Sequence, residues 1–246
     1  MLPCLGTMAI VASFLTEFGP ETASSSSIPG SYLTTYTRTS AGVHQVHVEP
    51  YYPRPGDLIL YNDHKLYWKI LYNLAGTEPP DHSGIIILKK DGKQAILESG
   101  PDNGRFVEIL DALPRLTQFE GTAYIRRLKD PLPKDQCAKL TDFAYAQEGK
   151  RYATGRLILQ MTPFRCRGSW RRKYFGGTVL DRDAWLCSEL VVAAGTIAGL
   201  FDPKVHPANA MYPRDIIFDE TYDLSSTWHV AGVWSPAPPK ILSADP

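Results

Sequence analysis

Short apolar runs separated by turn residues recur along the first half of the chain, and this pattern predicts β-strands. Strands are expected at 32–37, 43–48, 58–61, 85–88, 94–98, 105–109 and 122–127. The clearest hairpin is the one around Asp91-Gly92, because that dipeptide favours a two-residue turn. A loop is expected around Leu113-Pro114. The core runs predict an antiparallel sheet of about five strands, with the strands at 32–37 and 43–48 as an N-terminal hairpin.

Helical spacing of apolar residues dominates after this block. Helices are expected at 134–148, 156–161 and 184–200, with a short one at 65–74 between two strands and a last strand at 229–234. The segment 134–148 is amphipathic, and Gly149 stands where a left-handed residue commonly ends a helix. The order of the elements predicts an α+β fold in which helices pack on an antiparallel sheet.

The composition is that of an ordinary globular protein, with 43% apolar and 21% charged residues among 246. We expect one domain over 32–235, an apolar segment and flexible linker at 1–31, and a proline-rich tail at 236–246. Basic and acidic residues balance at 26 each, which argues against a nucleic-acid partner. The four cysteines are widely spaced, without a C-x-x-C pair, so neither a disulfide framework nor a cysteine-rich zinc site is indicated.

The N-terminal segment leaves the localisation open. Residues 2–15 are apolar and precede a serine tract, as in an export signal, but no Lys or Arg occurs before residue 38. The run of 14 residues is too short to span a bilayer. A cytoplasmic protein is the favoured interpretation, and export is the alternative if residues 1–23 act as a signal.

Cys187 begins the most apolar predicted helix of the chain. After the cysteine itself, Glu189 is the only ionisable side chain as far as Leu200, so this helix is expected to be buried nearly all round. Backbone N–H groups and the helix dipole at such an N-terminus favour a thiolate. Cys187 is therefore a candidate nucleophile, although free cysteines are also among the residues most often buried in a core.

A cysteine nucleophile needs a base and a polar group that orients the base. His82 enters one strand of the clearest hairpin and Glu98 leaves the other, so antiparallel pairing brings both to the same end. Asp81 and Asp57 are the alternative orienting groups. Asp81 is expected to point away from His82 because adjacent strand residues face opposite sides, and Asp57 is expected to cap the Pro55-Gly56 turn. Taken singly, His82 and Glu98 are also compatible with a solvated loop histidine and a surface carboxylate.

Four motifs together resemble a known family of cysteine enzymes. They are Pro55-Gly56-Asp57-Leu58-Ile59, His82-Ser83-Gly84-Ile85, Gly149-Lys150-Arg151-Tyr152 and Leu186-Cys187-Ser188-Glu189-Leu190, with Tyr212-Pro213-Arg214-Asp215-Ile216 behind them. The set is similar to the papain-like peptidases and amidases of the NlpC type, with the strand block placed before the cysteine helix. This order resembles the circularly permuted, YiiX-like branch, and the resemblance covers roughly residues 53–219.

The resemblance implies a permuted papain-like domain with Cys187 as nucleophile, His82 as general base and then acid, and Glu98 as the group orienting the imidazole. It also implies that Tyr152 lies by the nucleophile and helps to hold the substrate carbonyl or the oxyanion. Two segments depart from the family pattern, an insert at 64–81 and a basic, aromatic loop at 164–175. Both bear on substrate identity rather than on the three catalytic candidates.

The loop at 164–175 is a candidate substrate-binding segment. Arg165, Arg167, Trp170 and Arg171 could grip a phosphate or carboxylate through forked guanidinium contacts, or form a solvated face. The four histidines outside the hairpin motif that we expect to be ordered, His44, His47, His64 and His206, lack the spacing and the companions of a zinc site. We predict no metal and no cofactor.

The sequence therefore predicts a cysteine-dependent hydrolase that cleaves an amide bond, in a small peptide of the peptidoglycan type or in an N-acyl amide. A lipid acyltransferase or thioesterase of the same fold is the first alternative, because the apolar segment 65–74 could touch a membrane surface or line an acyl channel. A catalytically silent module that binds an anionic ligand is the second. The oligomeric state stays open.

Overall fold

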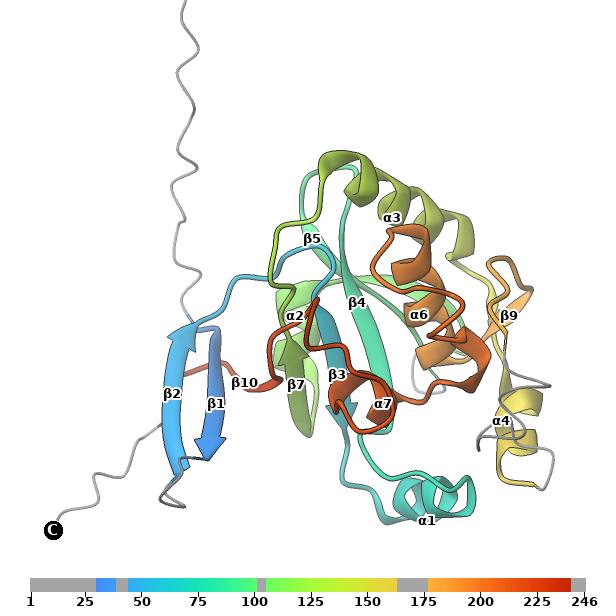
Figure 1. The fold of residues 1–246 in the computed structure, drawn as a ribbon, viewed down its shortest axis with the longest axis horizontal. Helices are drawn as coiled ribbons and strands as arrows, with labels where there is room; N and C mark the ends of the chain where they lie inside the picture. Colours follow the sequence, from blue (N-terminus) through green and yellow to red (C-terminus); the bar gives the residue numbers. More distant parts are fainter. Residues whose placement is uncertain (1–29, 39–43, 101–104, 163–176, 240–246) are drawn as a thin grey trace, which may run out of the picture.

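The computed structural model describes residues 30–38, 44–100, 105–162 and 177–239 (Figure 1). Strands supply most of the regular structure in the first half. Their bounds are β1 (Tyr32–Arg38), β2 (His44–Pro50), β3 (Leu58–Asn62), β4 (His82–Leu88), β5 (Gln94–Ser99), β6 (Val107–Asp111), β7 (Thr122–Arg126), β8 (Arg151–Tyr152), β9 (Ala184–Trp185) and β10 (Gly232–Ser235).

Within the described residues, eight strands form one antiparallel sheet in the order β2-β1-β10-β7-β3-β4-β5-β6, and the class is α+β as predicted. The expectation of about five strands was too low, because the N-terminal hairpin joins the same sheet. The connection is β10, which pairs with β1 on one side and with β7 on the other. The strand itself is predicted, but the position of a late strand between two earlier ones leaves no local signal in the sequence.

Helices cover the sheet in the same part of the chain. They are α1 (Leu66–Leu74), α2 (Ala112–Gln118), α3 (Lys134–Gln147), α4 (Thr154–Gln160), α6 (Cys187–Ile197) and α7 (Pro213–Ile217), with a 3-10 turn at Ala208–Ala210. The expected loop at Leu113-Pro114 is wrong, since these residues open α2. Proline is tolerated in the first turn of a helix, where its missing N–H has no partner to lose. Ala112 and Leu116, one turn apart, are the residues that α2 buries.

Two apolar clusters lie on opposite faces of the central strands. Alternate residues of β3 and β4, such as Leu58 and Ile85, pack with α3 and α6, which lie side by side in Figure 1. The intervening residues, such as Ile59 and Ile86, form the second cluster with α2. The period-two alternation of a strand explains this division. Helices α3 and α6 thus occupy one layer and α2 the other.

Helix α6 is the central element of the larger cluster. Its residues from Cys187 to Gly195 are all buried, as the apolar sequence predicts. The helix begins at Cys187 rather than at 184, because Ala184 and Trp185 form β9, parallel to β8. Gly195 contacts the ring of Phe201 so closely that a Cβ there would lie 2.5 Å from Phe201 Cδ2. Among the described residues, no helix combines the length and the apolar character needed to cross a bilayer.

Two helical glycines provide a matched test of this packing. Gly195→Ala should lower the free energy of unfolding by about 1–3 kcal/mol, because the added methyl group overpacks the core against Phe201. Gly155→Ala in α4 meets no atom within 4 Å and should raise stability by up to about 1 kcal/mol through helix propensity. Urea unfolding curves of both variants measure the difference. Equal stability of the two would contradict the close approach at Gly195.

Candidate active site

Cys187 is the first residue of α6, and only 5% of its surface is exposed. The short parallel ladder before it sets its place, since Tyr152 of β8 pairs with Trp185 of β9. The fully buried Trp185 donates its indole N–H to Gln147 Oε1 at 3.1 Å. Because Trp185 before the cysteine and Ser188 after it are both buried, the backbone of Cys187 has little freedom to move.

Glu189 is a buried carboxylate in the first turn of α6. It accepts a hydrogen bond from the backbone N–H of Leu186 at 3.3 Å, next to the helix start. Arg156 Nη1 donates to both of its oxygens at 2.6 Å, and Arg182 Nε lies 2.9 Å from Oε1. Two guanidinium groups therefore balance a negative charge that would otherwise oppose a thiolate at Cys187.

His82 is the first residue of β4, and its ring is confined by its neighbours. Tyr61 of β3 lies opposite it in the register, and the two rings stack with their centroids 5.5 Å apart. Gly100 also borders the imidazole, since a Cβ at that position would lie 3.0 Å from His82 Cε1. A larger residue at 100 would have to displace the ring.

Glu98 is fully buried near the end of β5. It pairs with Gly84, so His82, two residues earlier on the same face of β4, lies diagonally across from it. His82 Nε2 is 3.5 Å from Glu98 Oε2, and Arg115 Nε donates to Glu98 Oε1 at 2.7 Å. Burial favours the neutral acid, but His82 and Arg115 outweigh it and lower the pKa of Glu98 to about 2. The group is a carboxylate at neutral pH.

The same contacts determine the charge of His82. Burial disfavours the imidazolium, yet hydrogen bonding to Cys187 and to Glu98, together with the charges of both groups, raises the pKa of His82 to about 10. Nε2 is the ring atom that faces Glu98. His82 is therefore a cation at neutral pH. A cation beside a cysteine is the environment in which catalytic thiols occur.

The site spans the end of the β4–β5 hairpin. By strand alternation His82 and Glu98 belong to the face covered by α2, where Ile86 and Ile96 are buried. Helix α6 packs on the opposite face. Hydrogen bonding to Cys187 is nonetheless one of the causes that raise the pKa of His82, so the cysteine lies beside the imidazole at this end of the sheet. The hairpin thus brings His82 and Glu98 to one end, next to the cysteine.

The two other carboxylates considered as orienting groups have different partners. Asp57 accepts hydrogen bonds from the hydroxyl of Tyr51 and the backbone N–H of Arg54, each at 3.0 Å, and from the N–H of Leu128 at 2.8 Å. It therefore fixes the turn before β3. Asp81 accepts a hydrogen bond from the backbone N–H of Asp63 at 3.2 Å. Burial, followed by the interaction with Asp63, raises the pKa of Asp81 to about 7.

A cavity of about 30 Å³ lies beside Cys187. Its other lining residues, mostly apolar or aromatic, are Tyr72, Ala75, Thr77, Tyr152, Leu157, Gln160, Leu186, Ser188, Tyr212 and Pro213. Tyr152 is buried in this wall, so it lies in the same cavity as the cysteine. The volume is that of about one water molecule. The described walls therefore leave little free space beside the sulfur.

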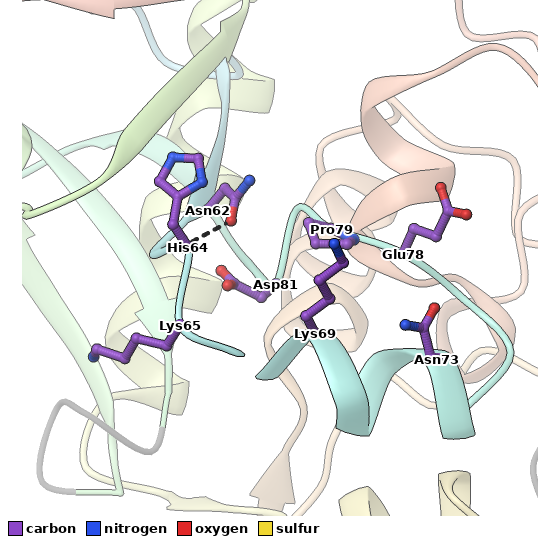
Figure 2. A pocket seen from close by; sticks show the side chains of 8 residues that line it. All are labelled: Asn62, His64, Lys65, Lys69, Asn73, Glu78, Pro79 and Asp81. Carbon is purple, nitrogen blue, oxygen red and sulfur yellow. Dashed lines mark hydrogen bonds between the residues drawn. The ribbon is translucent and has the colours of Figure 1, made fainter. Parts of the chain in front are cut away.

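A second pocket, of about 460 Å³, lies on another side of α1 and is polar (Figure 2). Its lining residues are Asn62, His64, Lys65, Lys69, Asn73, Glu78, Pro79 and Asp81. In Figure 2, Lys69 and Asn73 rise from one side of α1 toward the segment with Glu78 and Pro79. Cys187 is not part of this lining. The mixed charges favour no single type of ligand.

Three residues of this site were not found from the sequence. Arg115 holds Glu98 but falls in a segment expected to be a loop, and Gly100 gains its role only from the strand register. Tyr72 belongs to the insert at 64–81 and lines the Cys187 cavity. Its hydroxyl donates a short hydrogen bond to the carbonyl oxygen of Asp81, next to His82. A helical reading of 112–118 would have been the signal for Arg115.

The predicted binding residues Arg165, Arg167, Trp170 and Arg171 lie outside the described residues, so their role stays a prediction. In the part of the chain that the structure describes, no group of three or more His, Cys, Asp or Glu side chains is arranged to hold a metal ion.

No protein-family model matches the sequence, and a search of curated proteins gives no match. Among solved structures, the chain is similar to the crystal structure of the metalloprotein YiiX from Escherichia coli O157:H7. The TM-score is 0.41 and the identity 20%, over 60% of this chain and 67% of that chain. The neighbour carries the name of the branch that the sequence motifs resemble. Similarity at this level assigns neither a papain-like fold nor an activity to this chain.

The contact between Glu98 and His82 predicts that the pKa of His82 depends on the charge of Glu98. In Glu98→Gln the pKa of His82 should fall from its value of about 10, because the neutral amide no longer stabilises the imidazolium. Titration of the histidine side chains by NMR measures the shift, with the His82 signal assigned from its loss in His82→Gln. The five other histidines are internal controls. An unchanged His82 titration would contradict the pairing.

Proposed function

We propose that this chain is a cysteine-dependent hydrolase that cleaves an amide bond, with Cys187 as nucleophile, His82 as general base and acid, and Glu98 as the group orienting the imidazole. The observation that carries the proposal is the pair of His82 with the buried Glu98, with Nε2 3.5 Å from Oε2, whose imidazole interacts with a cysteine at a helix N-terminus. A cysteine buried only for packing needs no such pair beside it.

The proposed reaction has two halves. In the first, the Cys187 thiolate attacks the carbonyl carbon, and the His82 imidazolium gives its proton to the nitrogen as the C–N bond breaks, which leaves a thioester. In the second, neutral His82 takes a proton from water as the oxygen attacks the thioester carbon. The C–S bond breaks, the carboxylic acid leaves, and the thiolate–imidazolium pair is restored.

The developing oxyanion needs hydrogen-bond donors at fixed positions. The backbone N–H of Cys187 is suited to this role, because the first N–H groups of a helix have no partner within it. Tyr152 shares the cavity with Cys187 and is the second candidate donor. Arg115 supports the reaction indirectly, because its contact with Glu98 keeps that carboxylate ionised.

The cavity wall favours an acyl group over a strongly polar peptide. Ala75, Leu157, Leu186 and Pro213 lie in it, and it contains no charged side chain among the described residues. An N-acyl amide is therefore the preferred substrate class, and a peptidoglycan-type peptide is the other one. The same apolar wall supports a second candidate function, which is transfer of the acyl group to an acceptor other than water. Product analysis with and without an added amine or alcohol acceptor separates hydrolysis from transfer.

Labelling by a thiol-directed acylating probe tests the nucleophile. Cys187→Ala should abolish labelling at the peptide that contains residue 187, and His82→Ala should reduce its rate by about 10²–10⁴-fold, the usual effect of losing a general base. Mass spectrometry of the digested protein measures both.

Cys137→Ala is the matched control, because Cys137 is a partly exposed cysteine on α3 whose pKa is raised by burial. This variant should keep the parent rate at residue 187. If His82→Ala labels at Cys187 as fast as the parent, the thiol acts without its base and the proposal fails. The chain would then fit a catalytically silent binding module.

A further inference from the structure

Helix α1 exposes an apolar stripe on its surface. Leu66, Ile70 and Leu74 follow one another at intervals of four residues and are 71%, 52% and 57% exposed. Tyr67 beside them is 49% exposed. None of the nine residues of α1 is buried. Surface apolar residues are common singly, but a stripe along a whole helix indicates a binding surface.

The other two sides of α1 have different roles. Tyr72 faces the Cys187 cavity, and Ala75, directly after the helix, lines it as well. Lys69 and Asn73, also one turn apart, line the polar pocket of Figure 2. The helix therefore carries an inner wall for the site, a polar side and an outer apolar stripe. A movement of α1 would therefore change the wall of the cavity beside Cys187.

A movement of α1 would widen the cavity, whose free volume of about 30 Å³ is smaller than an acyl chain. Ser188, in another part of the lining, belongs to the buried start of α6. Helix α1 is the more weakly held wall, since its side chains are exposed or only partly buried. The hydroxyl of Tyr72 on the Asp81 carbonyl is a contact that must break or shift when the helix moves.

The charge around the stripe points to the partner. Between His64 and Gly76 the chain carries Lys69 and Lys65, whose Nζ lies 3.2 Å from Asp63 Oδ2, and no acidic residue. On α4, which also lines the Cys187 cavity, Ile158 and Leu159 are 54% and 48% exposed. Apolar side chains flanked by lysines, on a helix that lies on the protein surface, are the features that bind anionic lipid interfaces.

We propose that α1 docks on the surface of an anionic lipid bilayer through Leu66, Ile70 and Leu74, and that its displacement there opens the Cys187 cavity to an amphiphilic acyl substrate. The docking step is independent of the cysteine chemistry. The opening step rests on the proposed function, and it confines efficient turnover to substrates presented at a lipid surface.

Vesicle flotation tests the docking step on the full chain carrying Cys187→Ala, which removes any turnover. The chain should float with vesicles of equal parts phosphatidylcholine and phosphatidylglycerol, and much less with phosphatidylcholine alone. Leu66→Glu should lower the bound fraction at least about tenfold, because it places a charge in the stripe. Val230→Glu is the matched control, since Val230 is 72% exposed and lies outside α1, and it should bind as the parent does.

The comparison of Leu66→Glu with Val230→Glu also isolates α1 from the apolar N-terminal segment, which both variants retain. Equal flotation of the two variants overturns the docking proposal. So does a parent chain that does not bind the anionic vesicles. A dimer in analytical ultracentrifugation that Leu66→Glu dissociates, without any vesicle binding by the parent, assigns the stripe to a second copy and overturns it as well.

The opening step is measured by alkylation of Cys187 with iodoacetamide in the chain with its native cysteine. Anionic vesicles should accelerate alkylation at residue 187 by about tenfold or more in the parent and leave Leu66→Glu unchanged, while alkylation at Cys137 stays constant in both. Flotation without acceleration overturns the opening step and keeps the docking. A slow, vesicle-dependent alkylation that is insensitive to His82→Ala would instead contradict the proposed catalytic function.

Discussion

The site depends on a fully buried carboxylate, that of Glu98, placed at the end of a core strand. An ion at that depth is tolerated only with charged and hydrogen-bonding partners, and Arg115 and His82 are those partners. Arg115 comes from α2, whose position is fixed by Ala112 and Leu116 in the second core cluster. The packing of α2 therefore sets the charge of Glu98, and Glu98 in turn holds His82 as an imidazolium.

Glu189 repeats this principle beside Cys187. It is buried like Glu98, and its two guanidinium partners, Arg156 and Arg182, come from segments before the cysteine helix. One buried carboxylate acts on the imidazole, where negative charge favours the cation. The other lies near the sulfur, where negative charge would oppose the anion and is neutralised. The two buried carboxylates therefore meet opposite electrostatic needs on the two sides of the proposed site.

The sequence predicted the elements with strong local signals, and it failed where long-range pairing decides. The Asp91-Gly92 hairpin, the amphipathic 134–148 segment and the apolar cysteine helix all have counterparts in the structure. The order of the eight strands escaped prediction because β10 pairs with strands more than a hundred residues away in sequence. No periodicity along the chain encodes such a pairing. Arg115 and Gly100 were missed for the same reason. The contact of Gly100 depends on the strand register, and that of Arg115 depends on a helix with a proline in its first turn.

The narrow cavity beside Cys187 agrees with the same electrostatic requirement. The imidazolium–carboxylate pair of His82 and Glu98 gains strength as water is excluded, because the effective dielectric constant falls. A narrow cavity, however, leaves little room for a substrate. In the proposed opening step, a short helix with no buried residue, inserted between β3 and β4, resolves this conflict, since it lines the cavity through Tyr72 and contributes no residue to the buried core. When α1 moves away from the cavity, its apolar outer side can then bind a surface elsewhere, and this contact favours the movement.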